Sequence, residues 1–145
     1  MKIEHIGIAV KNLASANALF ESLLGVAPYK QEEVDSEQVM TSFFRAGESK
    51  IELLEATGES SAIARFIEKK GEGIHHIAFE TKDIRATMAE LKQKGFMLLS
   101  DEPRRGADNK LVVFVHPKSA NGVLVEFCQE VGPPSPEGGE VGKGQ

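Results

Sequence analysis

The sequence predicts an α+β fold in which one strand–helix–strands module occurs twice along the chain. Three observations support this prediction. The order of the predicted elements repeats, the residues that open the two halves match one by one, and each half has a histidine on its first strand and a glutamate on its last. The chain has 145 residues, of which 41% are hydrophobic and 27% charged, as is typical of one folded domain.

The first half contains one strand, one helix and two further strands. The β-branched run IGIAV lies within a strand in residues 1–10. In residues 12–25 the apolar side chains recur at helical spacing and a glycine ends the helix. Residues 38–47 and 49–56 then form two strands, joined by a turn at Gly47–Glu48.

The second half repeats this order after a short connecting helix at residues 60–71. A strand is predicted at 73–81 and a helix at 83–95, which starts at an aspartate and stops at a glycine. Two apolar strands follow at 110–117 and 122–129.

These elements define one domain over residues 1–130. We expect its two modules at about 1–58 and 73–130, on either side of the connecting helix. Residues 131–145 are rich in Pro, Gly and Glu and have few apolar side chains, which predicts a disordered tail.

The halves also match residue by residue. The stretch HIGIAVKNLASA from His5 aligns with HIAFETKDIRAT from His76, and Glu52 in GESKIELL corresponds to Glu126 in NGVLVEFC. The other matched pairs include Ile6 with Ile77, Gly7 with Ala78, Lys11 with Lys82, Asn12 with Asp83, and Leu13 with Ile84. Two strand–helix units can look alike by chance, but the paired His and Glu favour an internal duplication.

The stretch EGIHHIAFETKDI contains two adjacent histidines, and the duplication distinguishes them. His76, not His75, is the counterpart of His5. Because side chains alternate along a strand, His76 and Ala78 share one face while His75 and Ile77 share the other. The face of His5 and His76 has small neighbours, which leave room for a group above it. We expect His75 to have a structural role on the packed face.

Taken singly, each of these residues has an ordinary explanation. A lone Glu in a strand commonly faces solvent, and a lone His is commonly a hydrogen-bonded core residue. Together, His5, Glu52, His76 and Glu126 occupy equivalent places in two related halves, and pairing of the halves would bring them together. Two imidazoles and two carboxylates suit one borderline divalent ion such as Co, Ni, Zn or Mn, with positions left open for water or substrate.

Composition excludes several other classes of function. The net charge is −5 and no basic tract is present, so we expect no nucleic-acid partner. No apolar run approaches the roughly 20 residues of a membrane span, and the first residues do not resemble a signal peptide. A single cysteine, Cys128, cannot form an intramolecular disulfide and fits a reducing compartment. We therefore expect a cytoplasmic protein without membrane contacts.

The chain resembles the vicinal oxygen chelate superfamily, also called glyoxalase/bleomycin-resistance-like, and within it the methylmalonyl-CoA epimerases. The resemblance covers residues 1 to about 130. It rests on IEHIGIAV, GESKIELLE and AIARFIEKKGEGIHHIAFE, and on the later strings DEPRRGA and HPKSANGVLVEF. It implies two paired βαβββ modules that form curved mixed sheets around a metal site, helices outside, and a homodimer.

The resemblance also implies a site and a reaction. The metal ligands would be His5, Glu52, His76 and Glu126, with cobalt the favoured ion and Zn, Ni or Mn as alternatives. Some family members have Gln at the position of Glu52. The reaction would interconvert (R)- and (S)-methylmalonyl-CoA by removing the proton beside the thioester, and the ion would stabilise the resulting enolate.

Inversion of a stereocentre requires proton transfer on both faces. The resemblance implies that Glu126 is one acid–base group. The other, in some family members, is a glutamate early in the second strand of the first half. Here Thr41 stands at that position, and Glu37 is the nearest acid. Either the register differs, or another group serves.

Coenzyme A carries phosphates, so an acidic protein needs local cations to bind it. The loops EPRRGADNK and HPKSANG supply Arg104, Arg105, Lys110 and Lys118. We favour Lys118, which lies in the HPKS string of the family.

Two other functions are compatible with these ligands or this fold. A glyoxalase I also uses His, Glu, His and Glu around a metal and also proceeds through an enolate. A non-catalytic binding protein of the same fold need not keep four ligands. An extradiol dioxygenase, which would use iron with two His and one carboxylate, fits less well.

Overall fold

The computed structural model describes residues 1–131, which form two compact units, Lys2–Ala78 and the residues from Phe79 onward. Strand β5 contributes to both units, because the division falls near its end. Apart from its first residue, the tail predicted at 131–145 lies outside the described residues.

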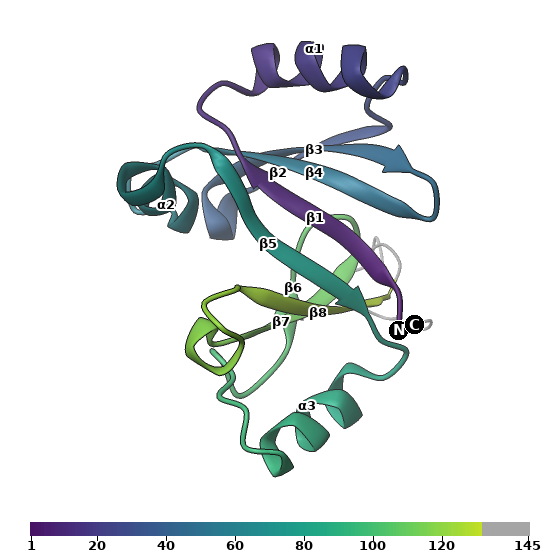
Figure 1. The fold of residues 1–145 in the computed structure, drawn as a ribbon, viewed down its shortest axis with the longest axis vertical. Coiled ribbons are helices and arrows are strands. Elements are labelled where there is room, and N and C mark those ends of the chain that lie inside the picture. Colours follow the sequence, from purple (N-terminus) through teal and green to yellow (C-terminus); the bar gives the residue numbers. More distant parts are fainter. Residues whose placement is uncertain (132–145) are drawn as a thin grey trace, which may run out of the picture. The chain divides into compact units, whose positions relative to one another are not determined.

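The first unit is a five-stranded mixed sheet with two helices (Figure 1). The strands lie in the order β2-β3-β4-β1-β5, with β1 parallel to β4 and with β2, β3 and β4 antiparallel. Its elements are β1 (Ile3–Ala9), α1 (Leu13–Leu24), β2 (Lys30–Val34), the 3-10 turn η1 (Asp35–Glu37), β3 (Val39–Ala46), β4 (Ser49–Ala56), α2 (Ala62–Lys70) and β5 (Gly73–Glu80).

Each face of this sheet packs against a different helix. Leu13, Ala16 and Phe20 of α1 cover the face that carries Phe44 and Leu53, and Ile8 and Val10 join the same cluster, as predicted for the apolar side of the first strand. On the opposite face, Ile63, Phe66 and Ile67 of α2 pack against Ala9, Val39 and Leu54. Alternation places the first histidine and Gly7 on this second face, beside the area covered by α2.

The second unit has the strand order β8-β7-β6, with each neighbouring pair antiparallel. Its core joins Ile84 and Met88 of the helix to Val113, with Phe127 packed alongside. The elements after β5 are α3 (Ile84–Gln93), β6 (Arg104–Arg105), β7 (Lys110–Val115), the 3-10 turn η2 (Pro117–Ser119) and β8 (Val125–Glu130). None of the helices within residues 1–131 is long and apolar enough to cross a bilayer.

The internal duplication is visible in the hydrogen bonds of each unit. Asn12 caps α1 by accepting from the Ser15 N–H, and Asp83 caps α3 by accepting from the Ala86 N–H. The first residue of each helix is bound in the same way: the Leu13 N–H donates to Glu55, and the Ile84 N–H donates to Gln129. Glu55 and Gln129 each lie three residues after one of the paired glutamates, so the modules agree in local detail.

Sequence patterning missed two strands, β2 and β6. In β2, with the sequence KQEEV, Val34 is the only apolar residue. Among the described residues, this strand lies at the sheet edge and pairs with β3. An edge strand buries little surface, so it needs no apolar alternation and leaves no such signal. Strand β6 consists of two arginines at the other edge. With both added, each module has the order βαβββ, as the resemblance implies.

Candidate metal centre

Three of the four predicted ligands meet on three adjacent strands of the first unit. His5 lies on β1, which runs between β4 with Glu52 and β5 with His76. The Nε2 atoms of His5 and His76 are 3.1 Å apart. Glu52 Oε1 lies 3.3 Å from the first of these nitrogens and 3.6 Å from the second. All three residues are at least nine-tenths buried.

These separations suit the shared coordination of one ion. Ligand atoms bound at about 2.1 Å to one metal are roughly 3.0 Å apart at right angles and roughly 3.4 Å apart at the tetrahedral angle. The three measured distances of 3.1, 3.3 and 3.6 Å fall close to this range. Two imidazole nitrogens and a carboxylate oxygen are also ligand types that borderline divalent ions accept.

The hydrogen bonds around His5 support the same interpretation. Its Nδ1 lies 2.6 Å from Oε1 of Glu4, which is 2% exposed. An ionised carboxylate only accepts, so Nδ1 carries a proton, and when the ring is neutral its Nε2 presents a lone pair. That lone pair faces Glu52 Oε1, which is also an acceptor. Two acceptors this close are stabilised by a cation between them, so the residues present fit a divalent ion.

Gly7 makes room for this arrangement. A Cβ atom at this position would lie 2.2 Å from Cε1 and 2.6 Å from Nδ1 of His76. The backbone of β1 thus passes beneath the imidazole, and only glycine permits that approach. Gly7 is also the Cα partner of Glu52 across the parallel pair. The room expected above the histidine face is therefore occupied by the second histidine itself.

His75 does more than pack. Its ring makes an edge-to-face contact with Phe66 of α2, at a centroid distance of 5.0 Å, which agrees with the predicted structural role. Its Nδ1 also lies 3.0 Å from Nδ1 of His76. It therefore touches the predicted ligand directly, a contact that strand alternation did not suggest.

Glu4 and Lys50 were not singled out from the sequence. Lys50 Nζ lies 2.5 Å from Glu4 Oε2, and Lys50 is the Cα partner of His5 in the sheet. A signal for Glu4 was present: it alternates with Ile6 and Ile8 on the apolar side of β1, where a charged residue requires a partner.

The remaining predicted ligand, Glu126, belongs to the second unit. It lies on β8, is 4% exposed, and pairs in register with Phe114 of β7. In the first unit, Glu52 pairs in the same way with Phe43 of β3. The two glutamates thus have equivalent neighbours in their own modules.

Thr41, at the position where the family resemblance implies an acid in some members, is fully buried on β3. Its hydroxyl donates to the backbone carbonyl of Glu32 at 2.9 Å and so strengthens the β2–β3 pairing. Glu37 lies in the turn η1 between these two strands. Neither residue belongs to the cluster formed by the two histidines and Glu52.

The four predicted phosphate-binding cations differ in their exposure. Arg104 and Arg105 are exposed on β6, and Lys118 is exposed in η2, where its N–H donates to His116 Nδ1. Lys110 is the exception. It is 4% exposed, and its Nζ lies 3.3 Å from the Asp108 carbonyl. Lys110 is the first residue of β7, which agrees with the strand predicted at 110–117. Its buried ammonium group contradicts the prediction of an accessible phosphate-binding cation.

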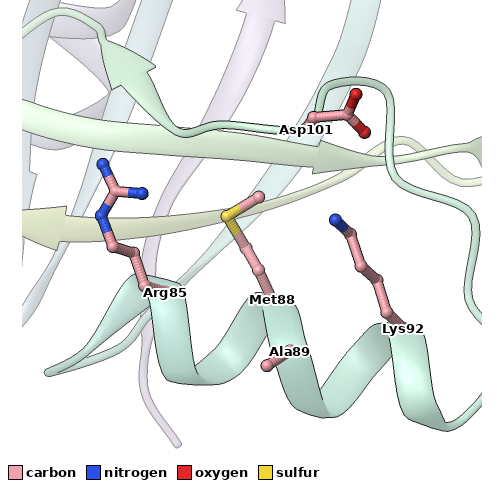
Figure 2. Close-up of a pocket in the computed structure, with 5 residues that line it drawn as sticks. All are labelled: Arg85, Met88, Ala89, Lys92 and Asp101. Carbon is pink, nitrogen blue, oxygen red and sulfur yellow. The ribbon is translucent and has the colours of Figure 1, made fainter.

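A hollow on α3 of the second unit contains none of the predicted site residues. Figure 2 shows Arg85, Met88 and Lys92 projecting from the helix toward Asp101 on the facing loop, and Ala89 completes the lining. Arg85 forms an exposed ion pair with Glu102. This surface has charges of both signs and no cluster of catalytic groups.

Comparison with known proteins assigns the family. Residues 4–114 match the family model described as the glyoxalase/bleomycin resistance protein/dioxygenase superfamily. The chain is 42% identical over 130 residues to the ethylmalonyl-CoA/methylmalonyl-CoA epimerase of Cereibacter sphaeroides, covering 88% of this chain and 97% of that one. It is 39% identical over 129 residues to human mitochondrial methylmalonyl-CoA epimerase, covering 88% of this chain and 73% of that one. The chain belongs to the methylmalonyl-CoA epimerase family.

Solved structures agree with this assignment. A variant of the Streptomyces coelicolor methylmalonyl-CoA epimerase, in complex with 2-nitronate-propionyl-CoA, is 36% identical, with a TM-score of 0.87. The match covers 91% of this chain and 99% of that one. The fold class and the family predicted from the sequence are thereby confirmed. Within the epimerase family, the cluster of His5, Glu52 and His76 is the candidate metal centre of this chain.

Proposed function

We propose that this protein interconverts (R)- and (S)-methylmalonyl-CoA and that His5, Glu52, His76 and Glu126 hold one divalent ion. The observation that carries the proposal is the buried convergence of two Nε2 atoms and one carboxylate oxygen within 3.1–3.6 Å, in a chain of the epimerase family. By resemblance, cobalt is the favoured ion, with Zn, Ni and Mn as alternatives.

The reaction removes and returns the proton on the carbon between the thioester and the carboxylate. Its transition state develops negative charge on the thioester oxygen. When bound, a divalent ion supplies positive charge that stabilises this oxygen. His5, His76 and Glu52 hold their ligand atoms in place, and their burial limits the access of water.

Glu126 is proposed as both a ligand and one of the two proton-transfer groups. Support comes from its burial, from its equivalence to Glu52 in the duplicated module, and from the family resemblance. Proton transfer by a positioned carboxylate contributes roughly 100- to 10,000-fold in rate. Thr41 is not proposed as the second group, since its hydroxyl already donates to a backbone carbonyl.

The exposed cations Arg104, Arg105 and Lys118 are proposed to bind the phosphates of coenzyme A. We also propose a homodimer and a cytoplasmic location, following the family resemblance and the single cysteine. Light scattering of the purified protein measures its oligomeric state, and fractionation of the source cells tests its location.

The deciding experiment follows one epimer of methylmalonyl-CoA in deuterium oxide, with the protein as purified, after treatment with chelator, and after Co(II) is added back. The proposal expects formation of the other epimer and deuterium incorporation at the α-carbon. Both should be lost with chelator and restored by Co(II). Absence of α-carbon exchange in the Co(II)-loaded protein would exclude the epimerase.

Two further substrates make the experiment specific. Ethylmalonyl-CoA is included because the relative from Cereibacter sphaeroides is named for both substrates. The hemithioacetal of methylglyoxal and glutathione tests the glyoxalase I alternative. Turnover of the hemithioacetal with no exchange of methylmalonyl-CoA would replace the proposed activity by that of a glyoxalase. Metal binding without turnover of any substrate would indicate a binding protein.

A further inference from the structure

We infer that Glu4 and His75 are a duplicated pair of positioning residues, each of which fixes the orientation and tautomer of the ligand histidine that follows it. The inference rests on the proposed metal site and extends it to two residues that are not ligands. Its basis is that Glu4 precedes His5 as His75 precedes His76, and both contact the Nδ1 atom of the next residue.

Glu4 holds His5 through a short charged contact. The 2.6 Å separation between Oε1 and Nδ1 is that of a charge-assisted hydrogen bond, and the side chains of Glu4 and His5 are 3% and 6% exposed. The other oxygen of Glu4 contacts Lys50 Nζ at 2.5 Å. The ammonium group compensates the buried carboxylate and keeps it an acceptor. With the proton held on Nδ1, the Nε2 lone pair of His5 points toward Glu52 and His76.

His75 does the same for His76 with a neutral partner. For Nε2 of His76 to bind an ion, the neutral ring must carry its proton on Nδ1. That N–H then donates to the Nδ1 lone pair of His75, 3.0 Å away. The His75 ring is itself fixed by its edge-to-face contact with Phe66, a residue packed against the core beneath α2. A continuous series of side-chain contacts therefore runs from Phe66 of α2 through His75 to His76.

The equivalence of the two contacts argues against coincidence. Glu4 and His75 are separated by the same number of residues as His5 and His76. The helix-capping residues Asn12 and Asp83 have this separation too. The residue before each histidine therefore has the same role in both copies of the module, although it is Glu in the first copy and His in the second. Metal-binding histidines generally need such a partner, and its loss typically lowers metal affinity about 10- to 100-fold.

The test measures affinity for Co(II) alone, by competition with a chromophoric chelator, on the full chain stripped of metal. The first variant, Glu4→Gln, keeps an oxygen but removes the charge. The second combines Glu4→Gln with Lys50→Met and so also removes the buried ammonium group. The third, His75→Phe, keeps an aromatic ring against Phe66 but removes the nitrogen. The melting temperature of each metal-free variant and the visible absorption spectrum of its Co(II) form are measured in parallel.

The matched control is Glu55→Gln. Glu55 accepts the N–H at the start of α1, and in the second module Gln129 already performs that task as an amide. This change therefore has the same chemistry as Glu4→Gln at a site away from the ligands. We expect unchanged Co(II) affinity for the control.

For Glu4→Gln, the double variant and His75→Phe, the inference expects Co(II) binding weakened by about 10- to 100-fold. The Co(II) spectrum should keep the shape set by the retained ligands. A purely structural role predicts a lower melting temperature with unchanged affinity, and that result would overturn the inference while leaving the proposed function intact. Failure of the unaltered protein to bind Co(II) would overturn both.

Discussion

The imidazole of His76 lies where a side chain at residue 7 would otherwise be, with its Cε1 only 2.2 Å from the position that a Cβ atom on Gly7 would take. The nearest atoms belong to a buried ring whose Nδ1 also contacts His75, not to the end of a flexible chain. The size of one residue on β1 therefore sets the position of a predicted metal ligand, His76, on β5.

Gly7→Ala is expected to displace the His76 ring and to weaken Co(II) binding at least about tenfold, with a loss of stability of about 1–3 kcal/mol from overpacking. Chelator competition and urea unfolding measure the two effects.

Gly58→Ala is the matched control for this glycine. Its Cβ would also meet a side chain, at 2.3 Å, but the atom is Oε1 at the end of Gln38, which can move aside. We expect near-normal metal binding for this variant. Equal losses in the two variants would contradict the role assigned to Gly7.

His5→Ala and His76→Ala should each reduce bound metal and epimerase activity together. Removal of a ligand should cost more than the roughly 10- to 100-fold loss caused by removal of its hydrogen-bond partner. Elemental analysis and turnover of one methylmalonyl-CoA epimer measure the two quantities. Activity that persists in a metal-free His76→Ala protein would show that the histidine cluster is not the catalytic centre.

Comparison of Glu52→Gln with Glu126→Gln should distinguish a residue that only binds the metal from one that also transfers a proton. Each change keeps an oxygen that can bind an ion and removes one negative charge. Turnover should fall only modestly for Glu52→Gln, because the family resemblance implies that Gln is also accepted at that position. For Glu126→Gln, kcat should fall by about 100-fold or more while metal remains bound. The two variants are compared for kcat and metal content, and equal kcat values would remove the acid–base role from Glu126.

Thr41→Val should leave turnover nearly unchanged and lower stability by about 1 kcal/mol, since its hydroxyl serves the β2–β3 pairing. Ser42→Ala is the control from the same strand. The Ser42 hydroxyl is buried and has no hydrogen-bond partner within residues 1–131, so its removal should not destabilise the protein. Urea unfolding and kcat are measured for both, and a large fall in kcat for Thr41→Val would restore a catalytic role to this position.

Lys118→Ala should raise KM for the coenzyme A ester about three- to tenfold with little change in kcat, as expected for one exposed phosphate contact. Lys110→Met should instead lower stability, because its buried ammonium group contacts the Asp108 carbonyl and lies 3.8 Å from the Asp108 carboxylate. Steady-state kinetics and thermal unfolding of both variants test this distinction. A raised KM for Lys110→Met at normal stability would show that burial does not keep Lys110 from the substrate.

The duplication made much of the candidate site predictable. It distinguished His76 from His75 and paired Glu52 with Glu126, because two copies of one module keep the same chemistry at the same position. Local patterning could not find β2, whose polar side chains lie at a sheet edge. It also misjudged Lys110, since burial of a lysine depends on what packs around it rather than on its neighbours in sequence.

The amino-acid sequence by itself determined the repeated module, the side of β1 that packs against α1, and the identity of the candidate ligands. These follow from the periodicity of apolar residues and from recurrence along the chain. Only the tertiary structure placed Glu4 and His75 against Nδ1 of His5 and of His76, and showed that Gly7 admits the His76 ring. Such contacts depend on strand register and on side-chain direction, and the packing of the whole sheet sets both.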